Sequence, residues 1–264
     1  MCLRRTKDPY VKLYDNGFSP FARKVRMVLE HKRLEAEIVD ALHQANRNAL
    51  GAVNARLEVP TLVDGDTTVV NSADIVGYLE HRYPERPVHP SDPTARVKAR
   101  AWERCSDTVV DAILVDISYW MWTRRPDAMP DGMHAAAQRD MLRIYDALER
   151  DLGDAEFLCG ELSIADIALF PQLSAGKLLG VPFSKQRHPR VNAWLKRLAA
   201  TPIGVHDLAR TRAYLESPDR AGLEVDRIFW RGDRIEWLLA RGFHRWFLAE
   251  IEHDRVIWPG LGVP

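Results

Sequence analysis

Residues 14–32, YDNGFSPFARKVRMVLEHK, decide the fold, because they mark the end of a strand and the start of a helix. Residues 11–15 (VKLYD) have the alternation and the β-formers of a short strand, and Asn16-Gly17 predicts a turn after it. Ser19 suits the cap of a helix and Pro20 its first position, and apolar residues then recur at helical spacing. The stretch therefore predicts a strand, a turn and an amphipathic helix.

The residues that follow extend this unit to a small mixed sheet. Residues 36–40 (AEIVD) predict a second strand, which a β-α-β crossover places parallel to the first, and residues 41–55 predict a helix or an irregular segment. The runs TLV (61–63) and TTVV (67–70) flank Asp64-Gly65-Asp66, which predicts a hairpin. Ser72 is then predicted to cap a helix. The predicted order is β-α-β-α-β-β-α.

A proline-rich segment, YPERPVHPSDPTAR (83–96), has the composition of an inter-domain linker. After it, the apolar spacing predicts helices over residues 94–119, 134–151, 163–179 and 191–200. The third of these has a clear start signal, with Ser163 as cap and Asp166 three residues later. Residues 227–264 are rich in tryptophan and phenylalanine, and their apolar spacing predicts one or two further helices.

The composition excludes several classes of function. The 37 Lys and Arg residues balance 37 Asp and Glu residues, so there is no electrostatic reason to expect nucleic acid or an anionic membrane as partner. No stretch approaches the roughly 20 apolar residues of a membrane span, so we expect a cytoplasmic protein with no membrane partner. Cys2, Cys105 and Cys159 are widely spaced, which fits a reducing compartment. The histidines show no paired ligand spacing, so no metal site is predicted.

Four short motifs, in this order along the chain, resemble the glutathione transferases. They are SPFARKVR (19–26), VPTLV (59–63), NSADIVGYLEHRYP (71–84) and LSIADIAL (162–169). The resemblance implies an α/β thioredoxin-like N-terminal domain followed by an all-α C-terminal domain. It divides the chain into a glutathione-binding domain (residues 9–85), an all-helical substrate domain (92–202) and an aromatic-rich helical extension (203–264) beyond the usual family length.

The resemblance gives Ser19 a chemical role besides capping. A helix N-terminus stabilises an anion, and a hydroxyl that donates to a thiolate lowers the pKa of the thiol. In the serine-type glutathione transferases, the role implied for Ser19 is therefore to hold the thiolate of glutathione ready for attack on an electrophile. A thiol-oxidoreductase mechanism is disfavoured, because Ser19 and Ala22 stand in the places of its two cysteines. Tyr14 is the competing hydroxyl, and the strand register favours Ser19.

Val59, Pro60, Asn71 and Ser72 are the glutathione-binding residues that the resemblance implies. In the family the Val-Pro bond is cis, and the residue before the proline, here Val59, pairs its backbone with the peptide part of glutathione. Residues 71 and 72 are implied to meet the ammonium and the carboxylate of the γ-glutamyl group, although Ser72 alternatively serves only as a cap. The family usually has an acidic residue where this chain has Asn71, so an ion pair is lost unless Asp74 restores the charge.

The resemblance implies an enzyme that conjugates glutathione, its co-substrate, to a small hydrophobic electrophile in detoxification, or uses glutathione to displace halide or reduce peroxide. It also implies a homodimer. The expected substrate wall is the run of aromatic and basic residues Tyr119, Trp120, Trp122, Arg124 and Arg125, with packing in the core or a dimer interface as the alternative. The alternative function is a non-catalytic binding or scaffold protein that acts through its C-terminal extension.

Overall fold

The computed structural model describes residues 11–41, 43–122, 127–217, 228–229 and 231–257. Its first part contains β1 (Val11–Asp15), α1 (Pro20–His31), β2 (Ala36–Asp40), α2 (Gln44–Val53), β3 (Thr61–Asp64), β4 (Thr67–Val70) and α3 (Ser72–Arg82). This order confirms the predicted β-α-β-α-β-β-α unit. The segment left open as helix or irregular forms the helix α2.

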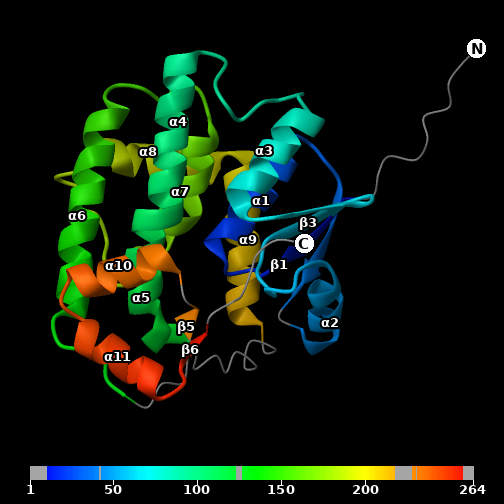
Figure 1. The fold of residues 1–264 in the computed structure, drawn as a ribbon. Coiled ribbons are helices and arrows are strands. Elements are labelled where there is room, and N and C mark those ends of the chain that lie inside the picture. The colour runs from blue at the N-terminus through cyan, green and yellow to red at the C-terminus, as the bar shows by residue number, and fades with distance from the viewer. Residues whose placement is uncertain (1–10, 42, 123–126, 218–227, 230, 258–264) are drawn as a thin grey trace, which may run out of the picture.

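The four strands form one mixed sheet in the order β2-β1-β3-β4. β1 runs parallel to β2 and antiparallel to β3, so Leu13 lies opposite both Ile38 and Leu62. β3 and β4 form the predicted hairpin, in which Gly65 adopts a φ of 59° that favours glycine. Leu13 and Leu62 are buried in the large core cluster together with residues of α1 and α3, whereas Tyr14 packs in a smaller cluster with Leu50 of α2. The sheet therefore has helices on both faces, which is the thioredoxin-like fold (Figure 1).

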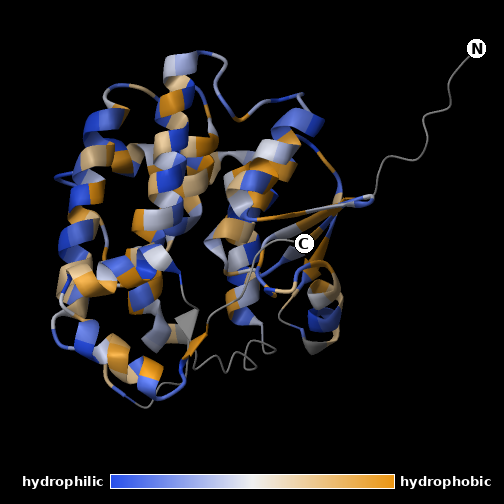
Figure 2. Ribbon diagram, in the orientation of Figure 1, coloured by the Kyte–Doolittle hydropathy of each residue, from blue (hydrophilic) through white to orange (hydrophobic). Residues whose placement is uncertain are grey.

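The second part is helical: α4 (Pro93–Cys105), a π-helical turn η1 (Ser106–Val110), α5 (Asp111–Trp122), α6 (Met133–Leu152), α7 (Ile164–Ser174), α8 (Pro189–Ala200) and α9 (Pro202–Glu216). The predicted helix over 94–119 is thus interrupted by η1, where buried Ser106 donates a hydrogen bond to the Ala168 carbonyl of α7 at 2.8 Å. The predicted helix over 163–179 ends at residue 174. The helices carry hydrophobic and hydrophilic residues side by side, as amphipathic helices do (Figure 2). No helix among the described residues is long and apolar enough to cross a bilayer.

Helix α9 was not predicted, although its start carries the same signal as α1. Thr201 accepts a hydrogen bond from the Gly204 N–H at 3.1 Å, and Pro202 occupies the first helical position. The helix packs against α1 through a buried ion pair between Arg23 and Asp207, with an N–O distance of 2.6 Å. Because both partners are buried, the register of α9 along α1 is fixed.

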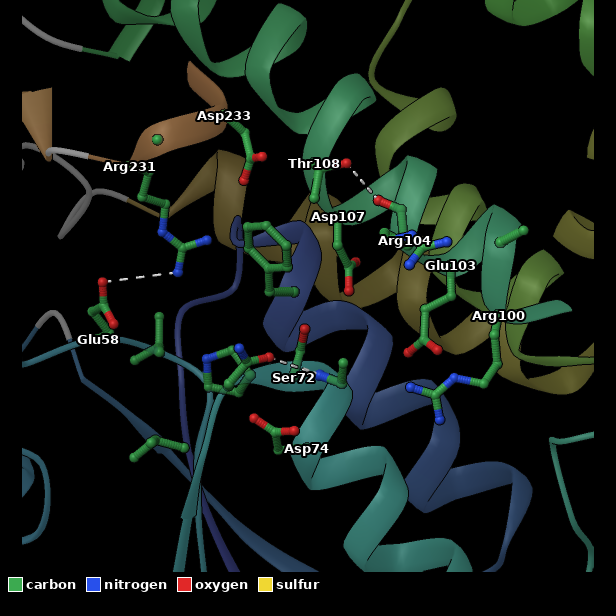
Figure 3. Close-up of a pocket in the computed structure, with 18 of the residues that line it drawn as sticks. Glu58, Ser72, Asp74, Arg100, Glu103, Arg104, Asp107, Thr108, Arg231 and Asp233 are labelled. Carbon is green, nitrogen blue, oxygen red and sulfur yellow. Dashed lines mark hydrogen bonds and ion pairs between the residues drawn. The ribbon is translucent and has the colours of Figure 1, made fainter. Parts of the chain in front are cut away.

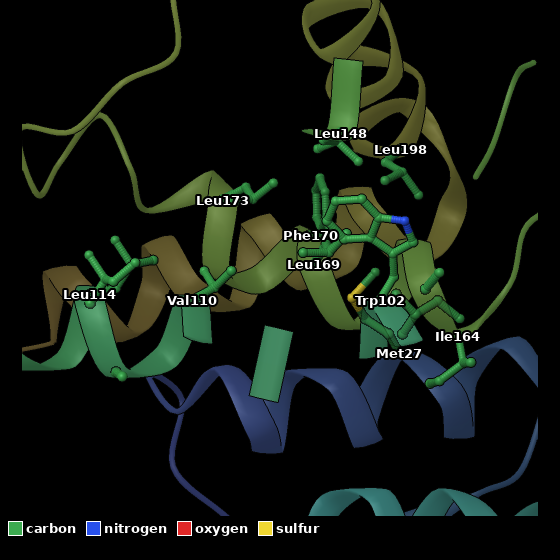
Figure 4. Packing of buried hydrophobic residues seen from close by; sticks show 14 of the residues in the cluster. Met27, Trp102, Val110, Leu114, Leu148, Ile164, Leu169, Phe170, Leu173 and Leu198 are labelled. Carbon is green, nitrogen blue, oxygen red and sulfur yellow. The ribbon is translucent and has the colours of Figure 1, made fainter. Parts of the chain in front are cut away.

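Helix α1 packs with both the sheet domain and the helical core. Its Met27 packs in the same buried cluster as Trp102 of α4 and Ile164 of α7 (Figure 4). Its Arg23 also donates to the Pro171 carbonyl and to Ser174 Oγ, both at 3.0 Å. The position of the α1 N-terminus is therefore set by contacts to both halves of the molecule.

The start of α7 confirms the predicted capping box. Asp166 accepts from the backbone N–H of Ser163 at 3.0 Å and from its hydroxyl at 2.9 Å. The same buried carboxylate accepts from the Leu158 N–H at 3.0 Å and from Trp194 Nε1 at 2.8 Å. One side chain thus joins the start of α7 to α8 and to the preceding loop.

The C-terminal segment contains β5 (Ile228–Phe229), α10 (Gly232–Ala240), α11 (His244–Glu252) and β6 (Val256–Ile257), so the prediction of one or two helices is confirmed. Helix α10 packs against α5 and crosses it in the view of Figure 1. Arg234 donates to the Asp111 carboxylate at 2.9 Å, and Trp237 Nε1 donates to Asp140 of α6 at 3.0 Å. Two aspartates of the helical core therefore anchor the segment.

Candidate functional site

A cavity of about 1160 Å³ lies where the sheet domain, α4 and the C-terminal segment meet. The sheet domain contributes the Val59–Pro60 turn and the start of α3, α1 contributes Phe21, and the far wall comes from α4 and η1 (Figure 3). Val59, Pro60, Asn71 and Ser72, which the sequence predicted as binding residues, all line it. Ser19 does not line it, although Phe21, two residues further along α1, does.

Ser19 caps helix α1. Its backbone is extended, with φ −61° and ψ 118°, and its hydroxyl oxygen accepts from the Ala22 N–H at 3.3 Å. Pro20 occupies the first helical position, where no N–H is needed. A hydroxyl that accepts in this way still carries its own proton, so Ser19 retains one donor for an anion placed at the helix N-terminus.

The Val59–Pro60 peptide bond is cis, as the resemblance implies. The turn before it is fixed by buried Asn54, whose Nδ2 donates to the Glu58 carbonyl at 3.1 Å and to Thr61 Oγ1 at 2.9 Å. In the described part of the chain, the backbone N–H and C=O of Val59 have no hydrogen-bond partner. The turn therefore presents an unpaired peptide unit at the cavity. The sequence prediction missed Asn54, whose isolated position carries no motif.

The start of α3 corrects one prediction. Asn71, not Ser72, is the N-cap: its Oδ1 accepts from the Ala73 N–H at 3.1 Å, and its φ of 71° lies in the region that asparagine tolerates better than most residues. Ser72 is the first helical residue and is 4% exposed. Asp74, in the first turn of the same helix, is the acidic residue that α3 contributes to the cavity lining.

Beneath the far wall lies a buried charge cluster. Lys24 of α1 donates to Glu103 at 3.2 Å and to Asp107 at 2.5 Å, and its side chain is 1% exposed. Burial raises the pKa of Asp107 to about 6, against the lowering effect of the Lys24 ammonium. The two carboxylates of this wall are therefore partly neutralised from below.

The C-terminal segment supplies the remaining wall through Arg231, Gly232 and Asp233. The Arg231 guanidinium carbon lies 5.1 Å from the centre of the Phe21 ring, and one guanidinium nitrogen lies 3.8 Å from Glu58 Oε1. The sequence prediction missed Arg231, because no local signal connects it to residues near positions 21 and 58.

The expected aromatic substrate wall lies elsewhere. Tyr119 and Trp120 do not line the cavity. Trp120 packs against Trp246 of α11 with ring centres 5.4 Å apart and donates from Nε1 to the Asp127 carbonyl at 3.1 Å. Arg124, Arg125 and the side chain of Trp122 lie outside the described residues. Helix α11 thus covers Trp120, which packs against the C-terminal segment instead of lining the cavity.

Other candidate groups lie outside the cavity. Tyr14 is buried in the sheet beside Leu50, in the smaller core cluster. Burial raises the pKa of the Cys105 thiol and of the Cys159 thiol, which disfavours a thiolate at either position. Within the described ranges, no group of three or more His, Cys, Asp or Glu side chains is placed to hold a metal ion.

Comparisons with known proteins agree on one family. The N-terminal domain model of the glutathione S-transferases matches residues 13–87, and the C-terminal domain model matches residues 131–197. A probable glutathione S-transferase GSTU1 from Oryza sativa subsp. indica is 29% identical over 202 residues, covering 70% of this chain and 83% of that protein. A stringent starvation protein A homolog from Pasteurella multocida (strain Pm70) is 26% identical over 195 residues, covering 73% and 87%.

Solved structures show the same likeness. A glutathione S-transferase from Methylobacterium radiotolerans JCM 2831, in complex with glutathione sulfonate, superposes with a TM-score of 0.64 and 25% identity. The match covers 75% of this chain and 94% of that chain.

Proposed function

Because the chain belongs to the glutathione S-transferase family, we propose that it activates the thiol of glutathione, its co-substrate, for attack on a small hydrophobic electrophile. In this reaction the sulfur forms a bond to the electrophilic carbon while the leaving group departs with its electron pair. Displacement of halide or reduction of peroxide are side reactions of the same activated thiol.

The observation that carries the proposal is the meeting of three backbone features in one cavity. These are the unpaired peptide unit at Val59, the N-terminus of α3 at Ser72, and the first turn of α1 at Phe21. Val59 would pair with the peptide part of glutathione, and the N–H groups and hydroxyl at Ser72 would bind the γ-glutamyl carboxylate. Asp74 would bind the ammonium in place of the acidic residue that Asn71 replaces.

We assign thiol activation to the hydroxyl of Ser19. Its proton would be donated to the sulfur, and the positive end of α1 would favour the thiolate. Ser19 itself does not line the cavity, and the assignment rests on its place as the cap of α1, two residues before Phe21, which does line it.

The test is the ultraviolet absorbance of the thiolate in bound glutathione, measured against pH. Replacing Ser19 by Ala should restore a normal thiol pKa and reduce conjugation by about ten- to a thousandfold, since one preorganised donor is lost. The lost cap should cost about 1 kcal/mol of stability, which the fold tolerates. Ser19→Thr, which keeps both hydroxyl and cap, should rescue activity. Tyr14→Phe should leave the thiol pKa of bound glutathione unchanged. If Tyr14→Phe raised this pKa as much as Ser19→Ala, thiol activation would be assigned to Tyr14 instead.

The second candidate is a non-catalytic binding or scaffold protein. The stringent starvation protein A homolog is not named as a transferase, and the Asn71 departure points the same way. Retention on immobilised glutathione separates the two candidates, because an enzyme requires binding and a scaffold does not.

We further propose that the protein is a cytoplasmic homodimer that acts in detoxification. Sedimentation would test whether it is a dimer. We propose that residues 9–85 bind glutathione, while residues 92–202 and 203–264 supply the electrophile side.

A further inference from the structure

We propose that Arg231 makes this protein selective for electrophiles that carry a carboxylate or a similar anionic group beside an apolar or aromatic part. The inference rests on the proposed transferase function and names the substrate class of the same cavity. It starts from the place of Arg231 at the beginning of α10, far in sequence from the residues it faces.

Arg231 lies beside the position where the thiol would react. Its guanidinium carbon is 5.1 Å from the centre of the Phe21 ring, and Phe21 is two residues from Ser19 on the first turn of α1. Figure 3 places Arg231 beside Glu58, at the opposite end of the cavity from Arg100. A second ligand bound over Phe21 would therefore meet Arg231.

Among the described residues, the guanidinium N–H groups of Arg231 form no hydrogen bond. Its nearest carboxylate is Glu58, at 3.8 Å, which is beyond hydrogen-bond distance. Glu58 is instead held by Arg56, with N–O distances of 2.9 and 3.0 Å. The Arg231 side chain is 34% exposed, so its planar set of N–H donors can receive a carboxylate in bidentate geometry.

The charges of the cavity leave Arg231 available for a second ligand. On the α4 wall, Glu103 and Asp107 are bound by Lys24. Arg100 and Arg104 lie on that wall, across the cavity from Arg231 in Figure 3. Among the described residues they therefore serve the opposite end of the cavity from Arg231.

Asp233 is the acidic residue on the same rim as Arg231. Among the described residues the two form no ion pair, and Asp233 is exposed to water, which screens its charge. Phe21 adds an apolar face under the guanidinium. The rim thus combines an aromatic surface with a cation whose ion pair to Glu58 is long, at 3.8 Å, and this pairing fits an aryl or apolar electrophile bearing an anionic group.

The backbone of Arg231 is fixed by the anchoring of α10. Arg234, three residues later, donates to buried Asp111 at 2.9 Å, and Trp237 donates to Asp140 at 3.0 Å. The guanidinium is therefore presented from a docked helix, which reduces the entropy lost when it binds a ligand.

The experiment compares two product conjugates by titration calorimetry: S-(2,4-dinitrophenyl)glutathione and its analogue with a carboxylate on the ring. Both carry the same glutathione part, so its contribution cancels in the ratio of their dissociation constants. The variants are Arg231→Met, Arg231→Lys and, as a control at the other end of the cavity, Arg104→Met. Binding of free glutathione is measured for each variant.

We expect the natural protein to bind the carboxylated conjugate roughly tenfold more tightly, as a charge-assisted hydrogen bond would give. Arg231→Met should abolish this preference and leave the neutral conjugate within about twofold, Arg231→Lys should keep part of it, and Arg104→Met should keep the ratio. Equal binding of the two conjugates by the natural protein, or an equal loss of both in Arg231→Met, would overturn the inference and leave the transferase function intact. If neither conjugate nor glutathione binds, the proposed function fails, and the inference with it.

Discussion

Replacement of Arg234 by Met should detach the C-terminal segment without unfolding the protein. The Arg234 side chain is 12% exposed and pairs with Asp111, which is 3% exposed. Nearby, Asp116 is fully buried, and neither of its oxygens has a hydrogen-bond partner in the described part of the chain. Burial raises the pKa of Asp116 well above its usual range, while Arg234 acts in the opposite direction. Arg234 thus supplies the positive charge that lies beside two buried acidic residues, Asp111 and Asp116.

The magnitude follows from breaking one buried ion pair. Removing a single partner leaves an uncompensated buried charge on Asp111, which costs about 3–5 kcal/mol. We take the lower end of this range, because the ion pair that is lost is the single pair between Arg234 and Asp111. About 3 kcal/mol corresponds to roughly a hundredfold change in the equilibrium between docked and undocked α10. Met retains most of the aliphatic part of the Arg side chain, so the loss is mainly one of the charged group.

Hydrogen exchange measured by mass spectrometry on peptides from residues 232–252 reads this equilibrium directly. These amides should exchange about a hundredfold faster in Arg234→Met, while amides of the sheet domain keep their protection. Arg143→Ala removes the same charge from a side chain that is 76% exposed and 3.4 Å from Asp140, and it should cost less than about 1 kcal/mol. Adding Asp111→Asn should recover part of the loss. Equal effects of Arg234→Met and Arg143→Ala would refute the reasoning.

Two further outcomes can be measured by chemical denaturation. Burial acts to raise the pKa of the Glu80 carboxyl. Hydrogen bonds from Lys32, His89 and backbone N–H groups lower it by more, so the pKa of Glu80 falls from 4.5 to about 2. The ionised carboxylate therefore stabilises the fold above pH 4.5, and this stability is lost as the pH falls toward 2. Glu80→Gln should cost about 2 kcal/mol of unfolding free energy at pH 7 and progressively less below pH 4.5. A difference between the two proteins that does not change with pH would contradict this. Gly17→Ala would place a Cβ 2.6 Å from the Tyr214 ring and should cost about 1–3 kcal/mol, whereas the same change in a Tyr214→Ala background should cost less.

Local signals predicted most of the sheet domain. Ser19 and Pro20 mark the start of α1, and Asp64-Gly65-Asp66 marks the hairpin, because caps and tight turns are specified by a few neighbouring residues. The same kind of signal misled at α3, where Asn71 and Ser72 are both good caps. The choice between them depends on a backbone φ of 71°, which the chain around the residue imposes.

Long-range contacts could not be predicted in this way. Arg234 and Asp111 are 123 positions apart, and nothing in either local sequence indicates the other. The break of the long helix at η1 likewise depends on contacts with α7, such as that of Ser106. The cavity wall that the sequence did not predict also depends on a long-range contact, because Arg231 reaches the cavity through the docking of α10.

The two walls of the cavity are also made at different times. Asn71 and Arg231 are 231 − 71 = 160 positions apart along the chain. At the usual translation rate of about 5–20 residues per second, the ribosome adds Arg231 roughly 8–32 s after Asn71. The wall around the start of α3 is therefore synthesised while the opposite rim does not yet exist, and a nascent chain at that stage presents this half of the cavity to the cell without Arg231.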